Sequence, residues 1–269
     1  MNNCSVIIVN YNTGDMLKEV VIKVLANEQV KEVTIIDNCS HDDSMKLLQN
    51  DPKIKKIYRQ ENHGFASSCN YGFKNICSDY VLFLNPDCFI SQYTIKALLE
   101  TFQPYSSAAI VGCMINNPDN TEQRAARRRL PTFWRAIKTF TKLEKLATWC
   151  HCFAGVNLSH LPLKKEAIKV QAISGALIMM RSDVFRKISG FDEKFPLHFE
   201  DLDLFKRTRN AGYDIIFNPS ITAIHHQGTS SQSNPKVRDL KKIGMERYFY
   251  KHCSTLSYLL IKALNKLRG

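Results

Sequence analysis

The chain has 269 residues, of which 44% are hydrophobic and 23% are charged, a composition typical of a globular protein that buries a substantial core. This composition argues against disorder. The nine cysteines are an odd number without paired spacing, which argues against a disulfide framework, and the first residues lack the pattern of a secretory signal. We therefore expect a reduced protein located in the cytoplasm.

The formal net charge of +12 is concentrated in two segments. Residues 124–145 contain eight Lys/Arg against one Asp/Glu, and residues 236–269 contain nine against two. Because the remainder of the chain is close to neutral, the basicity is local and indicates contact with an anionic surface. Nucleic acid, anionic lipid and a phosphorylated substrate are all compatible with the charge alone.

The first half of the chain alternates apolar, β-branched runs with longer helical patterns. This alternation predicts an open, mostly parallel α/β sheet with helices on both faces, in which ligands bind at the carboxyl ends of the strands. We expect strands over residues 4–9, 33–36, 54–58, 80–84 and 110–115, and helices over residues 15–26, 42–49 and 66–76.

The second half is less regular. Residues 121–169 predict a loop followed by short basic helices, and residues 170–180 form an apolar run broken only by Ser174 and Gly175. A helix over residues 200–211 and two short strands over residues 213–217 and 221–224 follow. From residue 239 we expect one or two amphipathic helices, with one face formed by Leu256, Leu260, Leu264 and Leu267.

Polar residues follow three of the predicted strands directly. They are Asn10-Tyr11-Asn12-Thr13, Asp37-Asn38-Cys39-Ser40 and Asn85-Pro86-Asp87. Turn formation would explain any one of them, but three in succession favour a shared binding crevice. No Gly-x-Gly-x-x-Gly follows the first strand, which disfavours a dinucleotide-binding fold.

Three carboxylates gather at the start of the helix predicted over residues 200–211. Glu200, Asp203 and Arg207 would share one helical face, so we expect Glu200 and Asp203 to be held in a structural ion pair. Asp201 would point about 100° away from Glu200 and be free to face a substrate. Helix capping alone would account for one or two of these carboxylates.

Two further features are compatible with a metal site. Asp87 follows a buried strand, where a carboxylate needs a cation or a hydrogen-bond donor, although a turn aspartate would look the same. His225 and His226 follow a short strand and are compatible with metal or phosphate binding.

Together these residues resemble glycosyltransferase family 2, and within it the rhamnosyltransferase-like branch of bacterial surface-polysaccharide enzymes. The resemblance covers roughly residues 5–230, and its motifs occur in the family's order. The matching motifs are Val9-Asn10-Tyr11-Asn12, Asp37-Asn38-Cys39-Ser40, Asn62-His63-Gly64-Phe65 with Asn70, Leu84-Asn85-Pro86-Asp87, Gly190-Phe191-Asp192-Glu193, Phe199-Glu200-Asp201-Leu202-Asp203-Leu204 and His225-His226-Gln227-Gly228-Thr229-Ser230.

The resemblance implies a GT-A fold with a Rossmann-like nucleotide-binding half. Residues 1–235 would form the catalytic domain, in which residues 1–115 bind the nucleotide sugar and residues 116–235 bind the acceptor, and residues 236–269 would form a basic amphipathic tail. It also implies that Tyr11, Asn12 and Asp37 line the pyrimidine pocket and that Asn62 and Gly64 lie near the ribose and diphosphate.

The resemblance assigns the chemistry as well. Asp87 and His225 would hold Mg²⁺ or Mn²⁺, Asn85 and Glu200 would contact substrate, and Asp201 would be the catalytic base. The chain departs from the family's Asp-x-Asp motif at its first position, where it has Asn85, so the metal site has one carboxylate fewer.

The implied activity is inverting transfer of one sugar from a nucleoside-diphosphate donor to a hydroxyl of a glycan or a lipid-linked acceptor. Rhamnose from dTDP is favoured, with galactofuranose or another hexose from UDP as the alternative. An anionic membrane surface at the cytoplasmic face is a further expected partner. A nucleic-acid-binding module is disfavoured, because no helix-turn-helix, finger or aromatic RNA-binding motif is present. Intact carboxylate and histidine motifs argue against an inactive relative that only binds nucleotide sugar.

Overall fold

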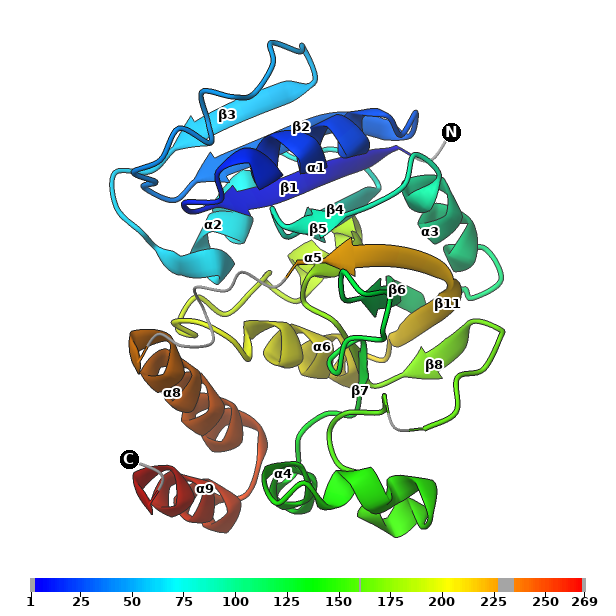
Figure 1. Ribbon diagram of the computed structural model, residues 1–269, viewed down its shortest axis with the longest axis vertical. Helices are drawn as coiled ribbons and strands as arrows, with labels where there is room; N and C mark the ends of the chain where they lie inside the picture. Colours follow the sequence, from blue (N-terminus) through cyan, green and yellow to red (C-terminus); the bar gives the residue numbers. More distant parts are fainter. Residues whose placement is uncertain (1–2, 160, 227–234, 268–269) are drawn as a thin grey trace.

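The computed structural model describes residues 3–159, 161–226 and 235–267. Its centre is a mixed sheet with the strand order β3-β2-β1-β4-β10-β6-β11-β5, and β8 also pairs with β11 (Figure 1). The strands are β1 (Cys4–Asn10), β2 (Val30–Asp37), β3 (Ile54–Tyr58), β4 (Tyr80–Leu84), β5 (Cys88–Phe89), β6 (Ala108–Asn116), β8 (Ile168–Val170), β10 (Leu177–Arg181) and β11 (Asp214–His225).

The prediction of an open, mostly parallel α/β sheet is confirmed. Strands β3, β2, β1 and β4 are all parallel, and β6 is parallel to β11. Strand β10 separates these two groups and runs antiparallel to both β4 and β6. Beside the main sheet, β7 (Arg127–Arg128) and β9 (Ala172–Ile173) form a small antiparallel pair. The carboxyl ends of β2, β1 and β4 therefore lie together at one edge of the sheet.

Helices cover the sheet and extend beyond it at one end. Figure 1 places α4, α8 and α9 at the end of the long axis opposite β3. The helices are α1 (Asp15–Leu25), α2 (Gly64–Phe73), α3 (Thr94–Phe102), α4 (Phe133–Phe140), α5 (Ser182–Lys187), α6 (Glu200–Asn210), α8 (Pro235–His252) and α9 (Thr255–Leu267), with 3₁₀ turns η1 (Leu143–Thr148) and η2 (His151–Phe153).

Several sequence-based boundaries are wrong. Residues 42–49 form turns rather than a helix. Here tertiary hydrogen bonds outweigh local helical pattern: the Asp42 carboxylate accepts from the Gly14 amide at 2.8 Å, and the Asn10 amide donates to the Ser44 hydroxyl at 2.8 Å. The two strands expected after residue 212 are one continuous strand, β11, which changes register between Asn218 and Thr222. Helix α3 was not predicted at all.

The C-terminal helices share the core of the sheet domain. Tyr248 and Phe249 of α8 and Ile261 of α9 are fully buried in the main hydrophobic cluster. The four leucines expected on one face of α9 do not behave alike: Leu256 and Leu260 are exposed, while Leu264 is half-buried against the core. The Leu267 side chain lies outside the described residues. Burial thus divides the apolar surface of α9 into an inner and an outer part.

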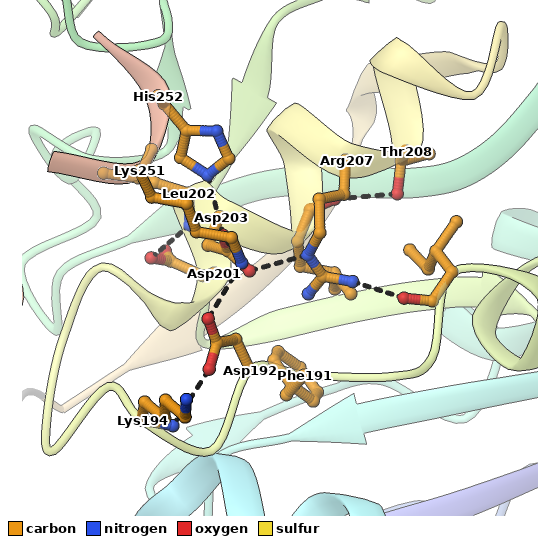
Figure 2. Close-up of polar contacts among 12 residues, drawn as sticks. Phe191, Asp192, Lys194, Asp201, Leu202, Asp203, Arg207, Thr208, Lys251 and His252 are labelled. Carbon is orange, nitrogen blue, oxygen red and sulfur yellow. Dashed lines mark hydrogen bonds and ion pairs between the residues drawn. The ribbon is translucent and has the colours of Figure 1, made fainter. Parts of the chain in front are cut away.

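Charged contacts hold α8 to α6. The Asp203 carboxylate lies 2.7 Å from Arg207 Nε, Lys251 Nζ and His252 Nε2, and Lys251 also reaches Asp192 at 2.8 Å (Figure 2). Burial acts to raise the pKa of Asp203, but hydrogen bonds from His252, Lys251 and Arg207 outweigh it and lower the pKa. The carboxylate is therefore ionised and fully engaged, and it fixes α8 beside the start of α6. Within the described residues, no helix has the length and apolar character required to cross a membrane.

Candidate active site

The ends of β1 and β2 are joined by a buried polar cluster. The Asn10 amide donates to Asp37 Oδ1 at 2.8 Å, and the second oxygen of Asp37 accepts from the Ser40 amide at 3.2 Å. The backbone amide of Asn12 in turn donates to the Ser40 hydroxyl at 3.0 Å. Asp37 is only 6% exposed, whereas the Tyr11 side chain is 47% exposed beside it. The cluster thus holds the loop in place and leaves the Tyr11 ring accessible.

A second set of hydrogen bonds connects this edge to the start of α2. The Asn38 amide donates to Asn62 Oδ1 at 2.7 Å, and Asn62 Oδ1 also accepts from the Gly64 amide at 2.9 Å. Gly64 has φ +78, and a Cβ there would lie 3.3 Å from the Pro196 carbonyl oxygen, so this corner requires glycine. The structure therefore brings Tyr11, Asn12, Asp37, Asn62 and Gly64 to one edge of the sheet.

The turn after β4 meets the end of β11. His225 Nε2 lies 3.1 Å from Asp87 Oδ1 and 3.3 Å from the side-chain nitrogen of Asn85. The backbone amide of His226 donates to the Asp87 backbone carbonyl at 3.0 Å. The short strand β5 pairs with β11 directly behind these residues. In the described part of the chain, no third His, Cys, Asp or Glu joins Asp87 and His225 to complete a metal-binding group.

Gln123 determines how His225 presents its ring. The Gln123 side-chain amide donates to the His225 carbonyl at 2.7 Å, so its oxygen is the end that faces His225 Nδ1 at 3.1 Å. Nδ1 is then the protonated nitrogen, and Nε2 is an acceptor that faces both the Asn85 side-chain nitrogen and the Asp87 carboxylate. Nε2 and Asp87 Oδ1, both acceptors, lie 3.1 Å apart, and a metal ion between them would be attracted by both. A carboxylate beside a ring nitrogen oriented by a second partner suits a divalent cation.

Asp201 lies at the first turn of α6 with both oxygens occupied. Oδ1 accepts from the Leu202 amide at 2.8 Å, and Oδ2 forms an ion pair with the Arg128 guanidinium. Arg128 also donates to the carbonyl of Ile173. A Cβ at Gly175 would lie 2.9 Å from Asp201 Oδ2, so the carboxylate packs directly on this glycine. Asp201 is thus a carboxylate that pairs with a guanidinium and remains partly exposed.

The two neighbouring carboxylates differ from Asp201. Asp203 forms the expected ion pair with Arg207, but Glu200 does not take part in it, so that prediction is wrong for Glu200. Glu200 is buried, and its Oε2 has no hydrogen-bond partner among the described atoms. Burial, followed by the nearby charge of Asp201, raises the pKa of Glu200 to about 8. Glu200 is therefore neutral at pH 7, because burying an unpaired carboxylate would cost more than protonating it.

One short segment links Asp201 to the Asp87–His225 pair. Gly175 contacts the Asp201 carboxylate. The carbonyl of the next residue, Ala176, accepts from the backbone amide of Asn85 at 2.9 Å. The turn that carries Asp87 and the helix start that carries Asp201 therefore flank the same two residues. The predicted base and the predicted metal ligands come from positions far apart in the chain, and the fold brings them together.

The backbone before α6 is strained. His198 and Phe199 both have positive φ, 62° and 68°. A Cβ at Gly244 of α8 would lie 2.7 Å from the His198 carbonyl oxygen, so the helix backbone packs closely against this turn. Consecutive left-handed residues other than glycine are costly and are retained where the surrounding structure enforces them. Here α8 supports the turn that orients Asp201.

Known proteins similar to this chain identify its family. Residues 5–162 match the family described as Glycosyl transferase family 2. N-acetylglucosaminyl-diphospho-decaprenol L-rhamnosyltransferase from Mycobacterium tuberculosis is 25% identical over 245 residues, which cover 86% of this chain and 78% of that protein. Rhamnosyltransferase WbbL from Escherichia coli is 22% identical over 245 residues, covering 85% of each protein.

The solved structure of mannosyltransferase PcManGT from Pyrobaculum calidifontis, in complex with GDP-Man and Mn²⁺, has a TM-score of 0.63. It is 13% identical and covers 93% of this chain, which spans 63% of that structure, so the similarity shows the fold alone. The fold and the family match together define a glycosyltransferase of GT-A architecture. The chain belongs to glycosyl transferase family 2.

Sequence reasoning missed Arg128, Gln123 and Gly175. Arg128 belongs to the run Arg127-Arg128-Arg129, which the charge count assigned to an anionic surface. The structure corrects this: Arg127 and Arg128 are 4% and 9% exposed, and they pair with Glu122 and Asp201. The available signal was the position of Gly175 in an otherwise apolar run. The motif residues 227–230 lie outside the described residues.

Proposed function

We propose that the protein transfers one sugar from a nucleoside-diphosphate donor to an acceptor hydroxyl with inversion at the anomeric carbon. The observation that carries the proposal is the Gly175–Ala176 segment, which positions Asp201 beside the turn of Asp87, and Asp87 in turn contacts His225 at the end of β11. Direct displacement needs a base for the acceptor hydroxyl and a site that binds the departing diphosphate. The two would lie on opposite sides of this short segment.

The nucleotide would lie at the carboxyl ends of β1 and β2. Tyr11 offers an exposed ring for the base, and Asp37 retains acceptor capacity beyond its two internal hydrogen bonds. Asn62 and Gly64, at the start of α2, would lie near the ribose and diphosphate, where backbone amides favour anions. Asn85 and Glu200 would line the donor site, with Glu200 as a neutral hydrogen-bond donor.

The diphosphate would bind at Asp87 and His225. Because these residues provide only one carboxylate oxygen and one ring nitrogen, phosphate oxygens and water would complete the coordination of Mg²⁺ or Mn²⁺. When bound, such an ion stabilises the negative charge on the departing nucleoside diphosphate. Gln123 would support this site by holding the His225 ring with Nδ1 protonated, which leaves Nε2 as the acceptor beside Asp87.

Asp201 would take the acceptor proton. The hydroxyl oxygen forms a bond to the anomeric carbon as the bond from that carbon to the phosphate oxygen breaks, and the proton passes to the Asp201 carboxylate. Arg128 would be a positioning residue, because its ion pair holds the Asp201 carboxylate against Gly175. Attack from the side opposite the leaving group inverts the anomeric configuration, and no covalent enzyme intermediate forms.

Similarity to the two rhamnosyltransferases favours dTDP-rhamnose as donor and a lipid-linked glycan as acceptor. A UDP-hexose is the alternative donor. The test is to measure thermal stabilisation of the purified protein by dTDP, UDP and GDP sugars with and without Mn²⁺, because a ligand that binds the folded state raises its melting temperature. Metal-dependent stabilisation by one pyrimidine nucleotide sugar supports the proposal. Stabilisation by none of the tested nucleotides in either condition would contradict it.

A further inference from the structure

The end of the molecule formed by α4, η1 and α9 exposes large apolar side chains. Trp134 of α4 is 69% exposed and Trp149, directly after η1, is 91% exposed, with Leu143 and Leu146 between them at 38% and 45%. On α9, Leu256 and Leu259 are 67% and 53% exposed. A soluble surface rarely gathers this many large apolar side chains unless they contact a partner. In Figure 1, α4, the green helical segment after it and α9 lie at the same end of the long axis.

Apart from the buried Glu144, the charged residues of the two segments that carry these side chains are all basic. Between Thr132 and Cys152 the only acidic residue is Glu144, and it is buried in contacts with Arg124, Thr139 and Asn157. The exposed charges of that segment are therefore lysines, among them Lys142 and Lys145. Helix α9 contains no acidic residue, and its Lys262 and Lys266 are exposed.

We propose that this end of the protein is a membrane-docking surface that binds the interface of a bilayer containing anionic phospholipid. Its two elements are the α4–η1 segment, with Trp134 and Trp149, and the outer face of α9, with Leu256, Leu259 and Leu260. Tryptophan favours the boundary between headgroups and acyl chains, and an amphipathic helix lies in that boundary with its apolar face inward. Lysines flanking both elements attract anionic headgroups.

The charge pattern favours a bilayer over a second copy of this chain. Two such surfaces facing each other would bring lysines against lysines, which is unfavourable. An anionic bilayer instead offers opposite charge together with an apolar interior. The inner face of α9 is already occupied, because Ile261 is buried in the core, so only the outer leucines are available for docking.

Docking would also fix the direction in which the catalytic site faces the bilayer. Helix α9 follows α8, and α8 is held to α6 by the ion pairs of Asp203 and to the Asp192 turn by Lys251. The proposal does not depend on the donor or on the proposed base, because binding to vesicles is measured without any substrate.

The test is co-sedimentation of the full chain with vesicles of phosphatidylcholine alone or phosphatidylcholine with phosphatidylglycerol, at low and high salt. We expect binding to the anionic vesicles at low salt, weak binding to the neutral ones, and loss of affinity at high salt. The Trp134→Ala/Trp149→Ala variant should bind anionic vesicles at least about tenfold more weakly. The matched control is Tyr93→Ala, which removes an aromatic ring that is 66% exposed before α3.

A second pair of variants separates charge from apolar contact. Lys142→Gln/Lys145→Gln should weaken binding on the order of tenfold, whereas Lys18→Gln/Lys31→Gln, on exposed positions of α1 and β2, should have little effect. Equal binding to neutral and anionic vesicles, binding to neither, or wild-type binding by the tryptophan variant would overturn the proposal. Concentration-dependent dimers that the tryptophan variant loses, without vesicle binding, would assign the surface to self-association and overturn it as well.

Discussion

Arg128 and Asp201, 73 residues apart in the chain, form a largely buried ion pair at the start of α6. Arg128 also donates to the Ile173 carbonyl, so one guanidinium connects the start of α6 to the segment that precedes Gly175. A planar guanidinium can make both contacts at once, and a lysine ammonium cannot reproduce this geometry. The pair therefore holds the Asp201 carboxylate in place beside the buried Glu200.

If Arg128 positions Asp201, Arg128→Gln should lower kcat about 10- to 100-fold while the affinity for the nucleotide remains close to that of the wild type. The reason is that the carboxylate loses the partner that orients it, whereas the β1–β2 edge is untouched. Steady-state kinetics and nucleotide titration measure the two quantities. Arg128→Lys should recover only part of the loss, and full activity in Arg128→Gln would remove the positioning role.

Loss of the base should affect turnover more strongly. Asp201→Asn keeps the shape of the side chain but removes its proton acceptor, and we expect kcat to fall by about 10² to 10⁴ with nucleotide binding retained. Asp183→Asn is the matched control, since that carboxylate is 62% exposed on α5 and pairs with Arg181 rather than with a residue of the site. Near-normal turnover in Asp201→Asn would assign the base to another group.

The diphosphate site should depend on Gln123 as well as on its direct ligands. Asp87→Ala should abolish metal-dependent nucleotide binding, and His225→Ala should weaken it less. Gln123→Met should lower metal affinity at least about tenfold, because outer partners of a ligating histidine typically contribute that much. Titration of Mn²⁺ in the presence of the nucleotide measures each effect. Activity that persists unchanged in chelator would show that no metal is required.

Gly175→Ala tests the contact between the segment and the base. The added Cβ would lie 2.9 Å from Asp201 Oδ2, closer than such contacts are normally found, so the carboxylate must move. We expect activity to fall about 10- to 100-fold, as a displacement of a reacting group by a fraction of an ångström can cause. In the Asp201→Asn background the same substitution should have little further effect. Equal losses in both backgrounds would argue for a general structural role.

Glu200 should make stability depend on pH. Because its folded-state pKa is raised to about 8 from the model-compound value of 4.5, the unfolded chain releases the proton first as pH rises, and stability is lost between these two values. Glu200→Gln cannot ionise, so its melting temperature relative to the wild type should increase from about pH 5.5 to about pH 8.5. Melting temperatures of both proteins, measured at about pH 5.5 and about pH 8.5, give this difference. A difference that is the same at both pH values would contradict a neutral buried Glu200.

The sequence alone determined the architecture and the edge at which the site lies. Alternating apolar runs and helical patterns are local properties, so they predicted β1 to β4, β6 and α6 with small errors in their bounds. A residue that directly follows a strand lies at the end of that strand, so the strand prediction also places the residue at the edge of the sheet. For this reason Tyr11, Asp37 and Asp87 could be assigned to the carboxyl edge before any contact was known.

Only the tertiary structure decided how the carboxylates and histidines are used. Helical spacing grouped Glu200 with Asp203, but burial makes Glu200 neutral. Asp201 instead pairs with Arg128. The tautomer of His225 depends on Gln123, 102 residues away. Residues 42–49 do not form the expected helix, because Ser44 and Asp42 accept hydrogen bonds from Asn10 of β1 and from Gly14. In each case, burial and partners are contributed by segments distant in the chain, and local sequence patterns contain no information about them.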